Sequence, residues 1–198
     1  VSTSMLAEDL KPNRLEAAKD VAAEFINGRP NDNIGITLFA GETFTQCPLT
    51  VDHAVLLDMI HNIKCGLITD GTAVGMGIAN AVTRLKDSKA KSKVIILLTD
   101  GTNNKGDISP MTAAEIAKSF GIRVYTIGVG TNGMAPYPYP VGNTVQYVSM
   151  PVEIDEKTLT EIAGTTDGNY FRATSNSKLK EVYEEIDKLE KTKLNVKE

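Results

Sequence analysis

The hydrophobic positions of this chain follow two patterns that alternate along the sequence. Short apolar runs rich in β-branched residues predict buried strands, at residues 34–40, 93–99 and 123–129. Between them, apolar residues recur at helical spacing and predict amphipathic helices, at residues 14–27, 52–63, 74–86 and 110–120. This alternation favours an α/β fold, doubly wound, with a mostly parallel sheet and helices on both faces.

The remaining segments complete a single domain over residues 1–198. Residues 42–50 follow the first strand after only Gly41 and predict one antiparallel edge strand. Residues 168–174 predict the last strand, residues 177–191 the closing helix, and residues 192–198 a tail. Residues 131–151 are expected to form a loop excursion, whose prolines and tyrosines suit a protein contact. The alternative is a hairpin that packs on its own domain.

Composition narrows the classes of function. The 198 residues are 41% hydrophobic and carry a formal net charge of −4 with no basic run, which argues against nucleic acid as a partner. No apolar run approaches the length of a membrane span, so we expect no direct membrane insertion by this segment. Cys47 and Cys65 flank a predicted helix that would hold them roughly 18 Å apart, so we expect two free thiols.

Two motifs point to enzymes but lack an essential part. Residues 128–133, GVGTNG, match the dinucleotide-binding pattern, but the prolines that follow forbid the helix that would receive the pyrophosphate. LLTDGT is similar to the nucleophile loop of haloacid dehalogenase phosphatases, yet Leu98 stands where the nucleophilic aspartate would be needed. Both motifs therefore favour a structural loop over catalysis, and we expect no enzyme activity.

A third group of residues comes from three different loops. Ser2 and Ser4 lie before the first predicted helix, and Thr72 lies before the helix predicted at residues 74–86. Asp100 directly follows the strand predicted at residues 93–99. Each has a simple structural explanation, as a helix cap or a turn residue. In an open α/β sheet, however, such loops meet over the carboxyl ends of the strands. Oxygen donors with few carboxylates suit Mg²⁺ or Mn²⁺, so together they predict a divalent metal site.

The pattern resembles the metal ion-dependent adhesion site of von Willebrand factor type A domains, which combines DxSxS, a threonine and an aspartate. SMLAEDLKPNRLEAAK, DGTAVGMGIANAV and KVIILLTDGTNNKG are in addition similar to the bacterial Bat aerotolerance family, most of all the BatA type. The resemblance implies that Ser2, Ser4 and Thr72 ligate the ion or lie near it, and that Asp100 reaches it through a water.

The resemblance also implies a strand that the chain lacks. In the family, the first aspartate stands immediately before the position of Val1, at the end of a first central strand. We therefore expect this strand to be missing between residues 34–40 and 93–99, which would leave two facing rows of unpaired backbone groups. Without that aspartate, we expect Ser2 and Ser4 to be poorly held and the metal to bind weakly.

The implied function is metal-dependent protein–protein interaction, in which a partner supplies an Asp or Glu carboxylate. For the Bat family, the resemblance implies other Bat proteins and a MoxR-type AAA+ ATPase as partners, in a complex linked to aerotolerance or stress. It also implies a segment of a bacterial inner-membrane-anchored protein, on the periplasmic or the cytoplasmic face. The alternative is a metal-dependent hydrolase, which would need a second acidic group near Asp100; Asn103 and Asn104 follow it instead.

Overall fold

A three-stranded parallel sheet forms the centre of the molecule. A computed structural model of the chain describes residues 1–66, 69–142 and 144–195. Within it, β3 (Lys93–Thr99) pairs with β4 (Ile122–Val129), which pairs with β7 (Tyr170–Ala173). The β4 strand is buried almost throughout because helices cover both of its faces.

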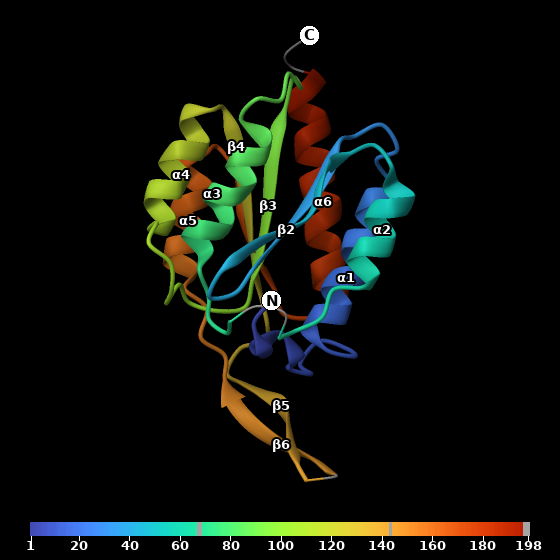
Figure 1. The fold of residues 1–198 in the computed structure, drawn as a ribbon, viewed down its shortest axis with the longest axis vertical. Helices are drawn as coiled ribbons and strands as arrows, with labels where there is room; N and C mark the ends of the chain where they lie inside the picture. Colours follow the sequence, from blue (N-terminus) through green and yellow to red (C-terminus); the bar gives the residue numbers. More distant parts are fainter. Residues whose placement is uncertain (67–68, 143, 196–198) are drawn as a thin grey trace.

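Helices pack on both faces of this sheet (Figure 1). On one face, α3 (Val74–Leu85), α4 (Pro110–Ser119) and α5 (Glu156–Thr165) form a core with β3 and β4. On the other, α1 (Arg14–Asn27) and α6 (Asn176–Asn195) pack against β4 and β7, while α2 (His53–His61) packs against α1. The doubly wound α/β prediction is confirmed. The α5 helix was not predicted. Asp155 caps its start, since the Asp155 side chain accepts a hydrogen bond from the Thr158 N–H.

A separate hairpin lies beside the parallel sheet. The strands β1 (Ile34–Phe39) and β2 (Thr43–Thr50) pair antiparallel, as predicted for residues 42–50. In the described part of the chain, neither strand is hydrogen-bonded to β3. The edges of β1 and β3 therefore face each other without a shared ladder.

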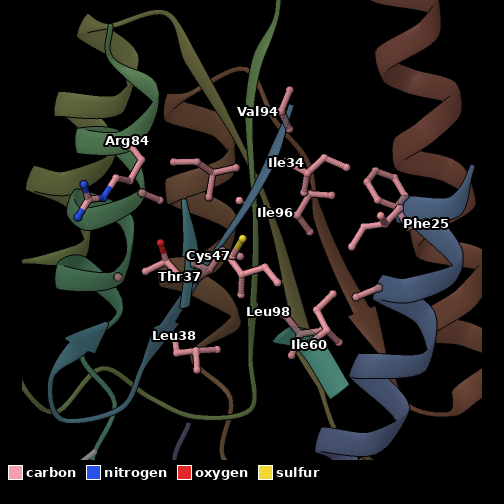
Figure 2. A pocket seen from close by; sticks show the side chains of 18 of the residues that line it. Phe25, Ile34, Thr37, Leu38, Cys47, Ile60, Arg84, Val94, Ile96 and Leu98 are labelled. Carbon is pink, nitrogen blue, oxygen red and sulfur yellow. The ribbon is translucent and has the colours of Figure 1, made fainter. Parts of the chain in front are cut away.

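A cavity of about 640 Å³ occupies the space between these two edges. Figure 2 shows that Ile34, Thr37 and Leu38 of β1 line it together with Val94, Ile96 and Leu98 of β3. Residues of α1 and α3 also line it, so we call it the strand groove. It lies where the additional strand was expected, between residues 34–40 and 93–99.

Two further segments differ from their predicted form. Residues 131–151 contain a β-hairpin, β5 (Met134–Val141) and β6 (Thr144–Pro151), which projects from the body (Figure 1). Residues 192–195, expected in the tail, belong to α6, while residues 196–198 lie outside the described part. Cys47 and Cys65 are both free thiols. Among the described residues, none of the helices combines the length and the apolar character that a membrane span requires.

Candidate functional site

The N-terminal turn brings two of the predicted hydroxyls to Asp100. The chain begins in a short 3₁₀ helix, η1 (Thr3–Leu6), which buries Met5. The Ser4 hydroxyl donates to Asp100 Oδ1 at 2.9 Å, and Ser2 Oγ lies 2.8 Å from Ser4 Oγ. Since Ser4 has a single hydroxyl proton and gives it to Asp100, Ser2 is the donor in the second contact. Ser2, Ser4 and Asp100 therefore form one hydrogen-bonded chain.

Thr72 lies at the same place. Its side chain is buried, and a Cβ atom added to Gly101 would lie 3.3 Å from Thr72 Oγ1. The Thr72 hydroxyl thus packs against the residue that follows Asp100. Thr72, Ser2 and Asp100 all line one end of the strand groove. The structure brings the four predicted site residues together from three loops.

Side chains from each loop hold the next loop in place. Asp70 accepts hydrogen bonds from the Thr3 N–H at 3.2 Å and the Thr3 hydroxyl at 2.7 Å, which joins the N-terminal turn to the Thr72 loop. The Asn104 side chain accepts from the Thr72 N–H, and the Asn103 side chain accepts from the Val74 N–H at 2.8 Å.

The N-terminal turn is therefore better held than we expected from the sequence. Asp70 supplies both of its oxygens to Thr3, and Met5 is buried in the core between α1, α2 and β1. Sequence reasoning missed Asp70, although an Asp-Gly pair in a loop is a recognisable turn signal.

The three predicted hydroxyls do not act as side-chain helix caps. The α1 helix is capped by Asn13, whose side chain accepts from the Glu16 N–H. The residue preceding α3 is Ala73, so the first turn of that helix relies on Asn103 instead. Ser2 precedes η1 but makes no side-chain capping bond. The simple structural explanation therefore fails for Ser2 and Thr72, and the hydroxyl of Ser4 is directed to Asp100.

Sequence reasoning also missed Arg14, which is ion-paired with Asp100. Arg14 is 3% exposed, and its guanidinium bridges two carboxylates. Nη1 donates to Asp100 at 3.0 Å, while Nε and Nη2 both donate to Asp9 at 2.7 Å. A cation in the first turn of a helix is unfavourable, because the helix dipole is positive there. The position of Arg14 in the sequence was therefore a signal that it needed a carboxylate partner. Asp9 in turn accepts from the Thr131 N–H at 2.7 Å, at the root of the β5–β6 hairpin.

The two carboxylates that share Arg14 differ in their electrostatics. Burial raises the pKa of Asp100 above its usual range, because its one contact with Arg14 and its bond from Ser4 do not offset the loss of water. Burial also acts to raise the pKa of Asp9, but hydrogen bonds from Arg14 and Thr131 outweigh it and lower that pKa. Of the two carboxylates, Asp100 is therefore the one whose negative charge is less well balanced by neighbouring cations and hydrogen-bond donors.

The donor set is rich in hydroxyls and poor in charge. Ser2, Ser4, Thr72 and Asp100 provide three neutral oxygens and one carboxylate, all hard donors. The described residues contain no cluster of three or more His, Cys, Asp or Glu side chains suited to a metal ion. The residues present fit a hard divalent cation held mainly by neutral oxygens, next to a buried carboxylate that is short of positive charge.

Solved structures with this fold include two from the Bat group. A BatB protein of Bacteroides thetaiotaomicron is 34% identical, with a TM-score of 0.82 over 96% of this chain and 95% of that one. An aerotolerance-related membrane protein of Bacteroides fragilis is 32% identical, with a TM-score of 0.81 over 94% of this chain and 92% of that one. The resemblance to the Bat family is confirmed by these neighbours. A third structure, proximal thread matrix protein 1 of the mussel byssus with a zinc-occupied MIDAS motif, is 24% identical over 93% of this chain and 43% of that one, with a TM-score of 0.70, and shares the fold.

Sequence relatives and a family model agree with the structural neighbours. A UPF0353 protein of Nocardia farcinica is 32% identical over 94% of this chain, and an uncharacterized protein of Borreliella burgdorferi is 28% identical over 100% of it. The chain spans 60% and 58% of the length of these two relatives. The model of the von Willebrand factor type A domain matches residues 1–185. The chain therefore belongs to the von Willebrand factor type A domain family.

Proposed function

We propose that this domain is a metal-dependent protein-interaction module, in which Ser2, Ser4, Thr72 and Asp100 hold Mg²⁺ or Mn²⁺. The observation that carries the proposal is the convergence of three hydroxyls, which are not used as helix caps, on one buried carboxylate. When bound, the cation would supply a Lewis-acidic position for a carboxylate of the partner protein. Asp or Glu of the partner is therefore the expected anchor.

The chain's own residues would orient the site. Thr3 and Asp70 hold the N-terminal turn against the Thr72 loop, so the serine hydroxyls keep their positions. Arg14 holds one oxygen of Asp100, which leaves the Ser4 side of that carboxylate directed toward the hydroxyls. Ser4 donates to Asp100, but Arg14 is paired with the other oxygen of that carboxylate, and von Willebrand factor type A domains are in general interaction modules. We therefore favour binding over the hydrolase alternative.

The similarity to Bat proteins supports a cellular setting for the proposal. An aerotolerance-related membrane protein and a BatB protein are among the structural neighbours. We infer that this segment belongs to an inner-membrane-anchored protein and works in a Bat complex linked to aerotolerance or stress. Other Bat proteins and a MoxR-type AAA+ ATPase are the partners that the family resemblance implies.

Calorimetric titration with MgCl₂ and MnCl₂ tests the metal site. We expect weak or no binding by residues 1–198, and millimolar or tighter binding when an apolar strand ending in aspartate is added directly before Val1. In the extended chain, Thr72→Ala and Asp100→Ala should abolish binding. The matched controls are Thr102→Ala and Asp107→Ala, exposed residues in the loop after Asp100, which should bind like the parent.

Either of two results would contradict the proposal. If the extended chain is folded but binds neither ion at millimolar concentration, then Ser2, Ser4, Thr72 and Asp100 have only a structural role. Binding that survives both alanine substitutions would place the cation elsewhere on the protein.

A further inference from the structure

The β5–β6 hairpin is an apolar projection without a single charged side chain. Between Met134 and Pro151 the sequence has no Asp, Glu, Lys, Arg or His. Seven large apolar or aromatic side chains on it are 43–59% exposed: Met134, Tyr139, Val141, Val145, Tyr147, Val148 and Met150. The hairpin extends away from the body (Figure 1), and isolated two-stranded hairpins are marginally stable in water. A surface of this kind is typical of an interaction site.

The outer edge of β5 cannot accept another strand. Pro136, Pro138 and Pro140 occupy alternate positions, and proline has no N–H to donate. In an antiparallel ladder, alternate residues point their backbone groups toward the partner strand or away from it. The carbonyl of Pro136 accepts from the Glu8 N–H outside the hairpin, so the prolines hold the outward positions. That edge is deprived of donors and lies against the N-terminal segment.

The outer edge of β6 is open. Residues opposite each other share the same orientation, and the outward prolines Pro136, Pro138 and Pro140 lie opposite Ser149, Tyr147 and Val145. The backbone N–H and C=O groups of these three β6 residues therefore also point outward. In the described part of the chain, β6 pairs with no strand other than β5. The edge has none of the charges or prolines that usually prevent pairing between molecules, apart from Pro151 at its end.

We propose that the open edge of β6 binds the same edge of a second copy of this chain, to form a four-stranded antiparallel sheet. The edge is self-complementary about Tyr147. A two-fold axis there places Tyr147 opposite Tyr147 of the partner subunit and Val145 opposite Ser149 of the partner subunit, and all three positions offer both a donor and an acceptor. An isologous contact of this kind closes at the dimer.

The charges around the hairpin are compatible with a second copy. No like charges meet along the edge because the hairpin carries none. The nearest carboxylate contact is Glu8, which accepts from the Tyr147 hydroxyl at 3.0 Å and lies 3.7 Å from Lys11 Nζ. Glu153, two residues after the end of β6, is exposed and acidic, which disfavours an anionic membrane surface as the occupant.

Sedimentation velocity in a chelating buffer tests the dimer without involving the metal site. We expect the weight-average mass to rise toward twice the monomer mass as the protein concentration is raised to roughly 1 mM. The double variant Val145→Pro, Ser149→Pro copies the β5 pattern and removes only outward N–H groups, so it should remain monomeric. The control, Val145→Thr with Ser149→Ala, keeps both N–H groups and should dimerise within about threefold of the parent affinity.

Hydrogen exchange verifies that the proline variant keeps its hairpin. The inward amides of Tyr137 and Tyr139 should stay protected, while those of Val145, Tyr147 and Ser149 should become protected in the parent only when it dimerises. A parent chain that stays monomeric at the highest concentration overturns the proposal. So does a dimer that persists in the proline variant with an intact hairpin, because it must then use another surface.

Discussion

In the described part of the chain, the facing edges of β1 and β3 and the outer edge of β6 all lack a partner strand, but they differ in what surrounds them. The edges of β1 and β3 face each other across the strand groove, with α1 and α3 lining the space between. The outer edge of β6 lies on a projecting hairpin, and every residue of β6 is exposed. The backbone chemistry is the same, but the first edge pair is enclosed and the second is open to solvent.

The difference explains which partner each edge can take. A strand in the groove must fit between two helices and two strands, so it must enter along the sheet and bury apolar side chains on both faces. Val1 and Ser2 line one end of that groove, so chain attached before Val1 would be positioned to enter it. The β6 edge imposes no such enclosure and suits a separate molecule. Enclosure, more than hydrogen bonding, therefore distinguishes the two kinds of edge.

The largest effect should follow from filling the groove. Adding an apolar strand of about seven residues directly before Val1 should raise the thermal midpoint by about 10 °C or more. Each fully buried aliphatic side chain contributes about 1.5 to 3 kcal/mol, which outweighs the backbone entropy of the added residues. Scanning calorimetry measures the change. An extension of equal length made of glycine and serine is the control, and an equal rise with that extension would show that the groove is not the cause.

A smaller loss should follow from removing the buried cation at the end of the groove. Arg14→Met should lower the free energy of unfolding by about 3 to 5 kcal/mol, because it leaves Asp9 and Asp100 buried without their shared partner. The matched control is Lys180→Met, which breaks an exposed pair with Glu24 and should lower the free energy of unfolding far less than Arg14→Met does. Urea denaturation at neutral pH compares the two. Equal losses would mean that burial of the Arg14 pairs has no energetic consequence.

The smallest effect should be a gain of stability from neutralising Asp100. In a chelating buffer at pH 7, Asp100→Asn should raise the free energy of unfolding by about 1 kcal/mol. Because burial raises the pKa of Asp100 in the folded state, the folded protein favours the protonated carboxyl. The stability from this group is present below the unfolded-state pKa and is lost as pH rises through the folded-state pKa. The advantage of the asparagine variant should therefore grow as the pH is raised from about 4 to 7.

Urea denaturation across that pH range measures the advantage, with Asp107→Asn, an exposed residue, as the control. A wild-type chain that is more stable than Asp100→Asn at pH 7 would show that the Arg14 contact outweighs burial. The pKa of Asp100 would then be lowered rather than raised.

Much of the fold could be predicted from local patterns. The α1 helix and the β3 strand have the predicted bounds, and the other predicted helices and strands differ by a few residues at their ends. Apolar periodicity is strong in these segments because each packs one face or both against the core. The α5 helix was missed because only three of its residues, Leu159, Ile162 and Ala163, are buried. For the segment of β5 and β6, the sequence predicted a loop and left a hairpin as the alternative, because prolines at alternate positions usually argue against a strand.

The sequence by itself determined the layered fold and the candidate site residues, because apolar periodicity and the position of loops after strands are local properties. Only the tertiary structure identified Arg14, Asp9 and Asp70 as the groups that hold the site together. Arg14 lies 5 residues from Asp9 and 86 residues from Asp100, and Asp70 lies 67 residues from Thr3. No local pattern encodes which carboxylate a buried arginine meets. Likewise, the sequence contains the three prolines of β5, but only the register of the hairpin decides that they block one edge and leave the other open. Hydrogen-bond direction is set by pairing between strands, so it exists only once the chain has folded.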